Sequence, residues 1–141
     1  MAFLLDTCLL SEFFKKQPDS RVSDWFAEQL PDTLFLSVLT IGELRKGLLR
    51  LPQSRKKTEI AKWINDAKIF YGRRILNFGL TTTEIWARIR AQSESVGKPL
   101  SMIDSLIAAS AVEHQLTVAT RNVRDFERCG VETFNPWSSN E

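Results

Sequence analysis

Histidine, cysteine and glycine-rich loops are scarce in this sequence, and each shortage excludes a class of chemistry. The 141 residues include one histidine, two cysteines and six glycines. Cys8 and Cys129 lie in no C-x-x-C pattern, so a zinc site is not indicated and we expect both thiols to be reduced and buried. His114 ends a predicted helix, where a histidine more often offsets the helix dipole than acts as a base. The glycines form neither G-x-G-x-x-G nor the Walker pattern, which leaves a nucleotide-binding loop unsupported.

A strong charge of one sign is also missing. The 19 Lys and Arg residues nearly balance 17 Asp and Glu residues, and the formal net charge is +2 at pH 7. Bulk electrostatics therefore do not indicate a nucleic-acid partner, and any basic surface must be local. Residues 45–57 carry six basic and no acidic side chains, a pattern that fits either a solvated helix face or a phosphate-binding patch.

Long hydrophobic runs are absent as well. The opening segment has no basic residues before its short apolar run, which Asp6 interrupts, so a signal peptide is not indicated. No stretch approaches the length of a membrane span. We therefore expect a cytoplasmic protein that makes no membrane contact.

Apolar residues make up 43% of the chain, enough for the core of one domain over residues 1–141. Hydrophobic patterning predicts short buried strands that alternate with helices along most of the chain. The strands are expected at 3–6, 34–37, 75–78, 117–119 and 133–135, and the helices at 7–15, 19–30, 40–50, 54–71, 81–95, 101–114 and 123–128. This alternation indicates an α/β fold with a mainly parallel sheet and helices on both faces.

Five acidic or amide residues lie near the predicted junctions between strands and helices. They are Asp6, Glu43, Asp104, Asn122 and Asp125. In a parallel sheet these junctions share the edge at the carboxyl ends of the strands, where α/β folds bind their ligands. The five side chains are therefore candidates for one site.

Helix capping offers a plain alternative for most of these acids. The segments 40–43, 101–104 and 122–125 have the spacing of a capping box, as does 81–84, for which no function is proposed. Two features argue against capping alone. Asp6 is predicted to lie outside any cap, and the third position of a capping box is typically Glu or Gln rather than Asp.

Asp104 is the most informative of these residues. Its neighbours at helical spacing are Leu100, Ile107 and Ala108, inside a helix that is apolar nearly all round. An ionised carboxylate there must be paired, hydrogen-bonded or metal-bound, and we favour the metal. Carboxylates without Cys or His suit Mg²⁺ or Mn²⁺ better than zinc. Two such ions could activate a water and stabilise the leaving oxygen of a phosphodiester, which is nuclease chemistry.

The ordered segments FLLDT (3–7), LSVLTIGEL (36–44), IDSLIAA (103–109) and ATRNVRDF (119–126) resemble those of the PIN-domain family. Within it, the chain is similar to the VapC-type ribonuclease toxins of prokaryotic toxin–antitoxin pairs. The closing FNPW (134–137) resembles the FitB-like branch. The likeness covers nearly the whole chain and implies a PIN-like three-layer α/β/α sandwich.

The resemblance also implies roles for individual residues. Asp6, Glu43 and Asp104 would form an acidic catalytic metal centre, which Thr7 and Thr120 line as hydroxyl donors. Many relatives carry an acid where this chain has Asn122, so a second ion would bind weakly or depend on Asp125, a further catalytic candidate. Cys8 stands where relatives often have Asn, and we expect it to pack as a small apolar residue.

The family mechanism is hydrolysis of RNA by a metal-activated water, with Mg²⁺ or Mn²⁺ as the cofactor. Phosphates of the RNA could be held by nearby basic residues, namely Arg45, Lys46, Lys98, Arg121 and Arg124. The expected partners are RNA and a cognate antitoxin, a small DNA-binding protein that inserts a segment into the acidic groove. A homodimer is also expected. The helix at 54–71 and its Trp63 stripe could serve the antitoxin or the core equally well.

Two other classes of protein fit part of the pattern. A phospho-receiver domain also has an acidic magnesium site, but it needs paired acids after the first strand and a phospho-accepting Asp near mid-chain, and this sequence has neither in place. A non-catalytic PIN-like module that binds RNA or a protein partner would follow if Asn122 had abolished metal binding. Metal-dependent cleavage separates this module from the enzyme.

Overall fold

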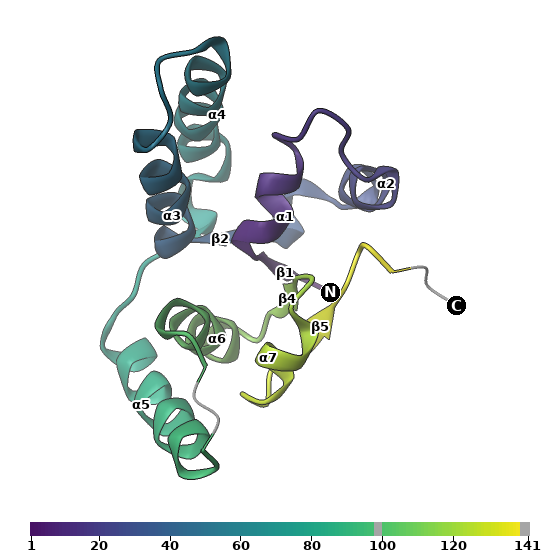
Figure 1. Cartoon of the computed structure of the whole chain (residues 1–141). Helices are drawn as coiled ribbons and strands as arrows, with labels where there is room; N and C mark the ends of the chain where they lie inside the picture. The colour runs from purple at the N-terminus through teal and green to yellow at the C-terminus, as the bar shows by residue number, and fades with distance from the viewer. Residues whose placement is uncertain (98–99, 139–141) are drawn as a thin grey trace.

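A computed structural model describes residues 1–97 and 100–138 of the chain. Its five strands form one sheet in the order β3-β2-β1-β4-β5, and every pairing between neighbours is parallel. The strands are β1 (Phe3–Leu5), β2 (Leu34–Ser37), β3 (Ile75–Leu76), β4 (Thr117–Ala119) and β5 (Thr133–Phe134). Helices lie on both faces of the sheet, as Figure 1 shows, and the predicted three-layer α/β/α architecture is confirmed.

The helices connect successive strands, as the alternating pattern predicts. They are α1 (Thr7–Glu12), α2 (Ser20–Glu28), α3 (Val38–Leu49), α4 (Arg55–Tyr71), α5 (Leu80–Ser95), α6 (Met102–His114) and α7 (Val123–Glu127), with short 3-10 turns at Pro31–Thr33 and Gly72–Arg74. None of the helices in the described part of the chain is both long and apolar enough to cross a membrane.

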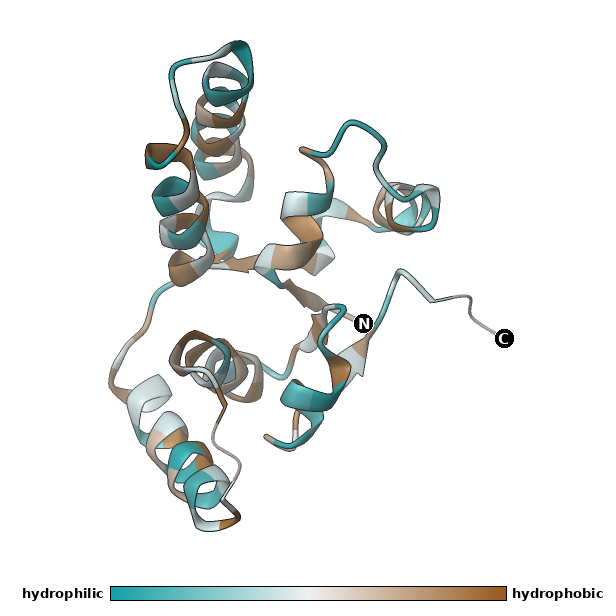
Figure 2. Cartoon of the chain, in the orientation of Figure 1, coloured by the Kyte–Doolittle hydropathy of each residue, from teal (hydrophilic) through white to brown (hydrophobic). Residues whose placement is uncertain are grey.

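Side chains of β1 alternate between two separate cores because successive residues of a strand point to opposite faces of the sheet. Phe3 and Leu5 join the core beneath α1 to α4, whereas Leu4 joins the core beneath α6 and α7. All three are at least 94% buried. The strands are accordingly hydrophobic, while hydrophilic residues gather on outward faces of the helices (Figure 2).

Several predicted element ends were displaced by one to three residues. The first helix ends at Glu12 rather than residue 15, and the strand predicted at 75–78 ends at Leu76. The helix starts predicted at residues 40 and 81 were wrong: Thr40 lies inside α3, whose N-cap is Ser37, and α5 begins directly after Gly79. Caps depend on local backbone direction, which hydrophobic patterning does not specify.

The Trp63 stripe of α4 serves the core and also borders an open groove. Ile60, Ile64 and Ala67 are buried in the core. Trp63 and Phe70 line an apolar groove of about 570 Å³ together with Phe13, Phe26, Asp66, Ala67 and Tyr71. Phe70 remains 55% exposed, so this helix combines core packing with an accessible apolar surface.

Candidate active site

Asp6 lies at the centre of a hydrogen-bond network at the carboxyl edge of the sheet. It follows β1, is 4% exposed, and its backbone N–H donates to the Ala119 carbonyl of the neighbouring β4 at 3.0 Å. The Thr120 hydroxyl, just after β4, donates to Asp6 Oδ2 at 2.7 Å. Parallel pairing of β1 and β4 therefore brings together residues 114 positions apart in sequence.

Asp6 also caps α1, contrary to the prediction that it lies outside any cap. Its Oδ1 accepts from the Thr7 backbone N–H at 2.8 Å, and its backbone is extended, as an N-cap requires. The carboxylate therefore combines a structural role with its place in the site. Each carboxylate oxygen has two lone pairs, so these bonds leave acceptor capacity for a further ligand.

Glu43 reaches the same edge from α3. The Thr7 hydroxyl donates to Glu43 Oε1 at 2.6 Å, so one threonine binds Asp6 through its backbone and Glu43 through its side chain. Such a bond to an ionised acceptor is short and directional. Thr7 and Thr120 thus line the acids as hydroxyl donors, in the positions that the resemblance implies.

Cys8 is a polar contact of the site as well as a packing residue. Its Sγ donates to Asp6 Oδ2 at 3.4 Å and lies 3.7 Å from the Thr120 hydroxyl. Burial, together with the negative charge of Asp6, raises the pKa of the Cys8 thiol to about 11, which keeps it protonated and able to donate. The expectation of a purely apolar role was wrong. Cys8 and Cys129 are both free thiols and are partly, not fully, buried.

Asp104 faces the other acids from the first turn of α6. Ser101 caps this helix by accepting from the Asp104 backbone N–H at 3.1 Å. Desolvation raises the Asp104 pKa, and the charges of Asp6, Asp125 and Glu43 raise it further. The carboxylate is therefore within electrostatic reach of all three acids.

Asn122 and Asp125 occupy the segment between β4 and α7. The Asn122 backbone N–H donates to the Thr120 hydroxyl at 2.9 Å, while its exposed side chain makes no capping bond. Both residues line a polar cleft of about 730 Å³ with Arg121 and Arg124. Burial and the charges of Asp104 and Asp125 raise the pKa of the nearby Cys129 thiol to about 11.

We call Asp6, Glu43, Asp104 and Asp125 the acidic centre. Over residues 1–97 and 100–138, no three His, Cys, Asp or Glu side chains are grouped closely enough to hold a metal ion as they stand. The donor chemistry nevertheless suits a hard cation, because all four side chains offer carboxylate oxygens. Like charges without a cation repel one another, and sharing an ion would require these side chains to lie closer together.

The basic candidates differ in their surroundings. Arg45 donates to Asn65 Oδ1 at 3.3 Å, and Lys46 is exposed on α3. Arg121 and Arg124 lie on the rim of the polar cleft beside Asp125. Lys98 lies outside the described residues.

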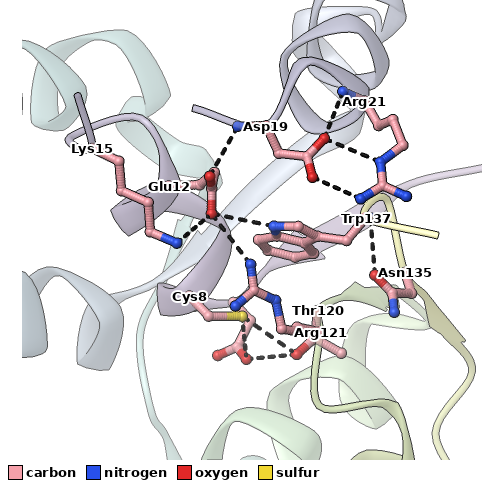
Figure 3. Close-up of polar contacts among 10 residues, drawn as sticks. Cys8, Glu12, Lys15, Asp19, Arg21, Thr120, Arg121, Asn135 and Trp137 are labelled. Carbon is pink, nitrogen blue, oxygen red and sulfur yellow. Dashed lines mark hydrogen bonds and ion pairs between the residues drawn. The ribbon is translucent and has the colours of Figure 1, made fainter. Parts of the chain in front are cut away.

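Glu12, which the sequence analysis did not identify, is the most heavily hydrogen-bonded carboxylate near the site. It is 3% exposed at the end of α1. Its Oε1 accepts from Lys15 at 2.9 Å, Trp137 Nε1 at 3.2 Å and Arg121 at 3.3 Å, and its Oε2 accepts from the Asp19 backbone N–H at 2.9 Å (Figure 3). We call these five residues the Glu12 cluster. A single acidic residue in an otherwise amphipathic helix gives no sequence signal, because its donors come from distant segments.

The chain is similar to known proteins over nearly its whole length. The PIN domain family model matches residues 3–131. The chain is 36% identical to toxin FitB of Neisseria gonorrhoeae over 95% of this chain and 97% of that protein, and 36% identical to VapC ribonuclease Y4jK of Sinorhizobium fredii over 95% and 96%. It superimposes on a chain of FitAB bound to an IR36 DNA fragment with a TM-score of 0.92, at 34% identity and over 99% and 98% of the two chains. With a matching family model, whole-length relatives and a matching fold, this chain belongs to the PIN-domain family.

Proposed function

We propose that this chain is the toxin of a toxin–antitoxin pair and that it acts as a metal-dependent endoribonuclease. The observation that carries the proposal is the acidic centre at the carboxyl edge of the sheet, where Asp104 is within electrostatic reach of Asp6, Glu43 and Asp125. Carboxylates gathered in this way are suited to a divalent cation and to phosphodiester hydrolysis.

The names of relatives support the nuclease part of the proposal. Besides VapC ribonuclease Y4jK, the chain is 25% identical over 98% of its length to a tRNA(fMet)-specific endonuclease VapC of Shigella flexneri. FitB is named a toxin. These names and the carboxylates of the site both indicate nuclease activity on RNA.

Mg²⁺, with Mn²⁺ as the alternative, is the cofactor that we propose. Asp6, Glu43 and Asp104 would hold it, with Asn122 and Asp125 as the candidates for a second position. A bound ion would favour ionisation of the attacking water and offset negative charge on the phosphate oxygens. Closure of the carboxylates is required, because the described residues do not yet form a group of three.

The chain's own hydroxyls have a defined part in this scheme. Thr120 and Thr7 each donate a hydrogen bond to an acid of the centre, at 2.7 Å to Asp6 and 2.6 Å to Glu43. These bonds hold the two carboxylates in position for a ligand. Asp104 joins them from the first turn of α6, where Ser101 is the N-cap.

An antitoxin is the partner that accompanies this function. Structures similar to this chain include FitAB and a VapBC2 complex from Rickettsia felis bound to a promoter DNA fragment, the latter 26% identical with a TM-score of 0.73. We propose that an apolar segment of the antitoxin binds the groove lined by Trp63 and Phe70 of α4. A homodimer is part of the same proposal and is tested by measuring the molar mass in solution.

The proposal is tested by incubating the purified protein with structured RNAs in Mg²⁺ or Mn²⁺, with and without EDTA. Cleavage that requires the ion and is lost in an Asp104→Asn variant is the expected result. Failure of the metal-loaded, folded protein to cleave any RNA would favour the second candidate, a non-catalytic PIN-like module that binds RNA or a protein partner. The exposed amide of Asn122, in place of an acid, is the observation that favours this second candidate.

A further inference from the structure

Arg121 is held in place by two contacts from segments far apart in the sequence. Its Nη2 donates to Glu12 Oε1 at 3.3 Å, and its Cζ lies 4.3 Å from the centroid of the Trp137 ring. A guanidinium that is both ion-paired and stacked on an indole loses much of its rotamer freedom. Figure 3 shows the Arg121 guanidinium against the Trp137 ring, with Cys8 and Thr120 nearby.

The anchor is itself rigid. Glu12 and Trp137 are 3% and 7% exposed. Their side chains bond to each other, and the Trp137 backbone N–H donates to Asn135 Oδ1 at 2.9 Å. The FNPW segment at 134–137 thus has a physical task in this chain, because it supplies both the ring and the turn that place Arg121.

Arg121 still presents donors to solvent. Its side chain is 50% exposed although Glu12, its ion-pair partner, is buried. It lines the polar cleft of about 730 Å³ next to Asn122 and Asp125. Guanidinium has five N–H donors, so the bond to Glu12 leaves others available for an anion.

The residues on either side of Arg121 connect it to the acidic centre. Thr120 donates to Asp6 at 2.7 Å, and the Asn122 backbone N–H donates to Thr120 at 2.9 Å. These bonds place the backbone of Arg121 next to Thr120 and Asp6, and Asp125 lines the same cleft as the Arg121 side chain. An anion bound by Arg121 would therefore lie near one carboxylate of the acidic centre. A phosphodiester flanking the scissile bond is the anion that this arrangement suits.

We infer that Arg121 binds a backbone phosphate of RNA and that Glu12, acting through Arg121 together with Trp137, is a positioning residue for this contact. The inference rests on the proposed function. Glu12 does not touch the substrate. It holds the guanidinium in the binding geometry before RNA arrives, which lowers the entropy lost on binding.

The test measures RNA affinity by fluorescence anisotropy in EDTA, and KM and kcat in Mg²⁺, for Glu12→Gln, Arg121→Ala and the double variant. Arg121→Ala should weaken RNA binding roughly tenfold, as expected for one charge-assisted contact. Glu12→Gln keeps the side-chain shape but loses the ion pair, and should raise KM severalfold with a smaller change in kcat. The double variant should bind RNA no more weakly than Arg121→Ala alone.

Arg124→Ala is the matched control, because Arg124 lies in the same segment and lines the same cleft. When Arg124→Ala is combined with Glu12→Gln, the losses of RNA affinity should be additive. When Arg121→Ala is combined with Glu12→Gln, they should not be additive. Additive losses for Glu12 and Arg121 would overturn the positioning role and leave Glu12 purely structural. Should Glu12→Gln fail to fold, unchanged RNA affinity in the half-exposed Arg121→Ala variant would still refute the inference.

Failure of the inference is distinguishable from failure of the proposed function. If the wild-type protein cleaves RNA with Mg²⁺ and these variants have unchanged RNA affinity and KM, only the inference fails. If the wild-type protein cleaves no RNA, the proposed function fails, and the anisotropy measurements decide the phosphate contact by themselves.

Discussion

The acidic centre and the Glu12 cluster are two carboxylate sites that share a segment of chain but differ in charge. Positive side chains balance Glu12, whereas the acidic centre contains carboxylates alone. In the Glu12 cluster, one carboxylate accepts from two cationic side chains, an indole N–H and a backbone N–H. In the acidic centre, desolvation and the negative charges of Asp6, Asp125 and Glu43 raise the Asp104 pKa. One site is satisfied by the chain itself, whereas the other lacks compensating positive charge.

This difference in charge indicates a stabilising role for the Glu12 cluster and a functional role for the acidic centre. A buried carboxylate with several donors anchors the segments that supply them, here α1, the turn at Asp19 and the chain around Trp137. Carboxylates held together without a cation lower the stability of the fold and are retained where a ligand needs them. Thr120 and Arg121, adjacent in sequence, contact one site each.

Asp104→Asn removes one charge of the acidic centre and should have the largest effect. We expect cleavage of RNA to fall on the order of a thousandfold, because a ligand and charge of the acidic centre are lost. The measurement is the initial rate of cleavage at saturating Mg²⁺.

The same variant should unfold at a temperature a few degrees higher than wild type in EDTA. The sign follows from the raised Asp104 pKa: the folded state disfavours the charged form, so a neutral amide relieves repulsion at neutral pH. A lower melting temperature would contradict this account of the acidic centre.

Glu12→Ala should act in the opposite direction on stability. It leaves Trp137 Nε1, the Asp19 N–H and Arg121 without their acceptor, and we expect the free energy of unfolding to fall by about 3 kcal/mol. Urea denaturation measures it. Glu94→Ala is the control, because Glu94 forms an exposed ion pair with Arg90 on α5 and should cost less than about 1 kcal/mol. Equal losses in both variants would remove the distinction between the two sites.

Addition of Mg²⁺ should stabilise the protein by supplying positive charge to the acidic centre. At a concentration a hundredfold above its Kd, an ion that binds only the folded protein stabilises it by about 2.7 kcal/mol. The stabilisation should appear in wild type and in Glu12→Gln, and should shrink in Asp104→Asn. Calorimetric titration provides the Kd. Equal stabilisation of all three proteins would show that the ion binds elsewhere.

The pH dependence of the unfolding free energy should depend on the Glu12 cluster, and this is the smallest of the expected effects. Hydrogen bonds from Lys15 and the Asp19 N–H lower the Glu12 pKa. The stability that they provide is present at neutral pH and is lost as the pH falls below the ordinary range of a glutamate carboxyl. Unfolding free energies of Glu12→Gln should therefore decline less on acidification than those of wild type, and parallel curves would argue against the lowered pKa.

Much of the fold follows from hydrophobic patterning, because buried strands and amphipathic helices require apolar residues at fixed spacing. The strand at Thr117–Ala119 was predicted with its observed ends, and the helix expected at 54–71 begins one residue later, after Ser54 as its N-cap. Element ends at Glu12 and Leu76 were less predictable. Helix and strand ends depend on tertiary contacts, which the hydrophobic periodicity of the sequence does not specify.

The sequence alone determined which chemistry was available and where along the chain it could lie. Acids after the predicted strands indicated an acidic site at the carboxyl edge, since parallel strands end at the same edge. The scarcity of Cys and His directed the expectation toward a hard cation. The metal itself and the roles of the individual site residues stay predictions.

Only the tertiary structure decided which side chains meet. The bonds of Thr7 to Glu43 and of Thr120 to Asp6 join residues 36 and 114 positions apart, and the Glu12–Trp137 bond spans 125. No local pattern encodes such pairs, because a hydrogen bond depends on distance in space, and distant segments become neighbours only through strand order and helix packing. Glu12 was invisible in the sequence for this reason, and the fold makes it the anchor of the segment that borders the acidic centre.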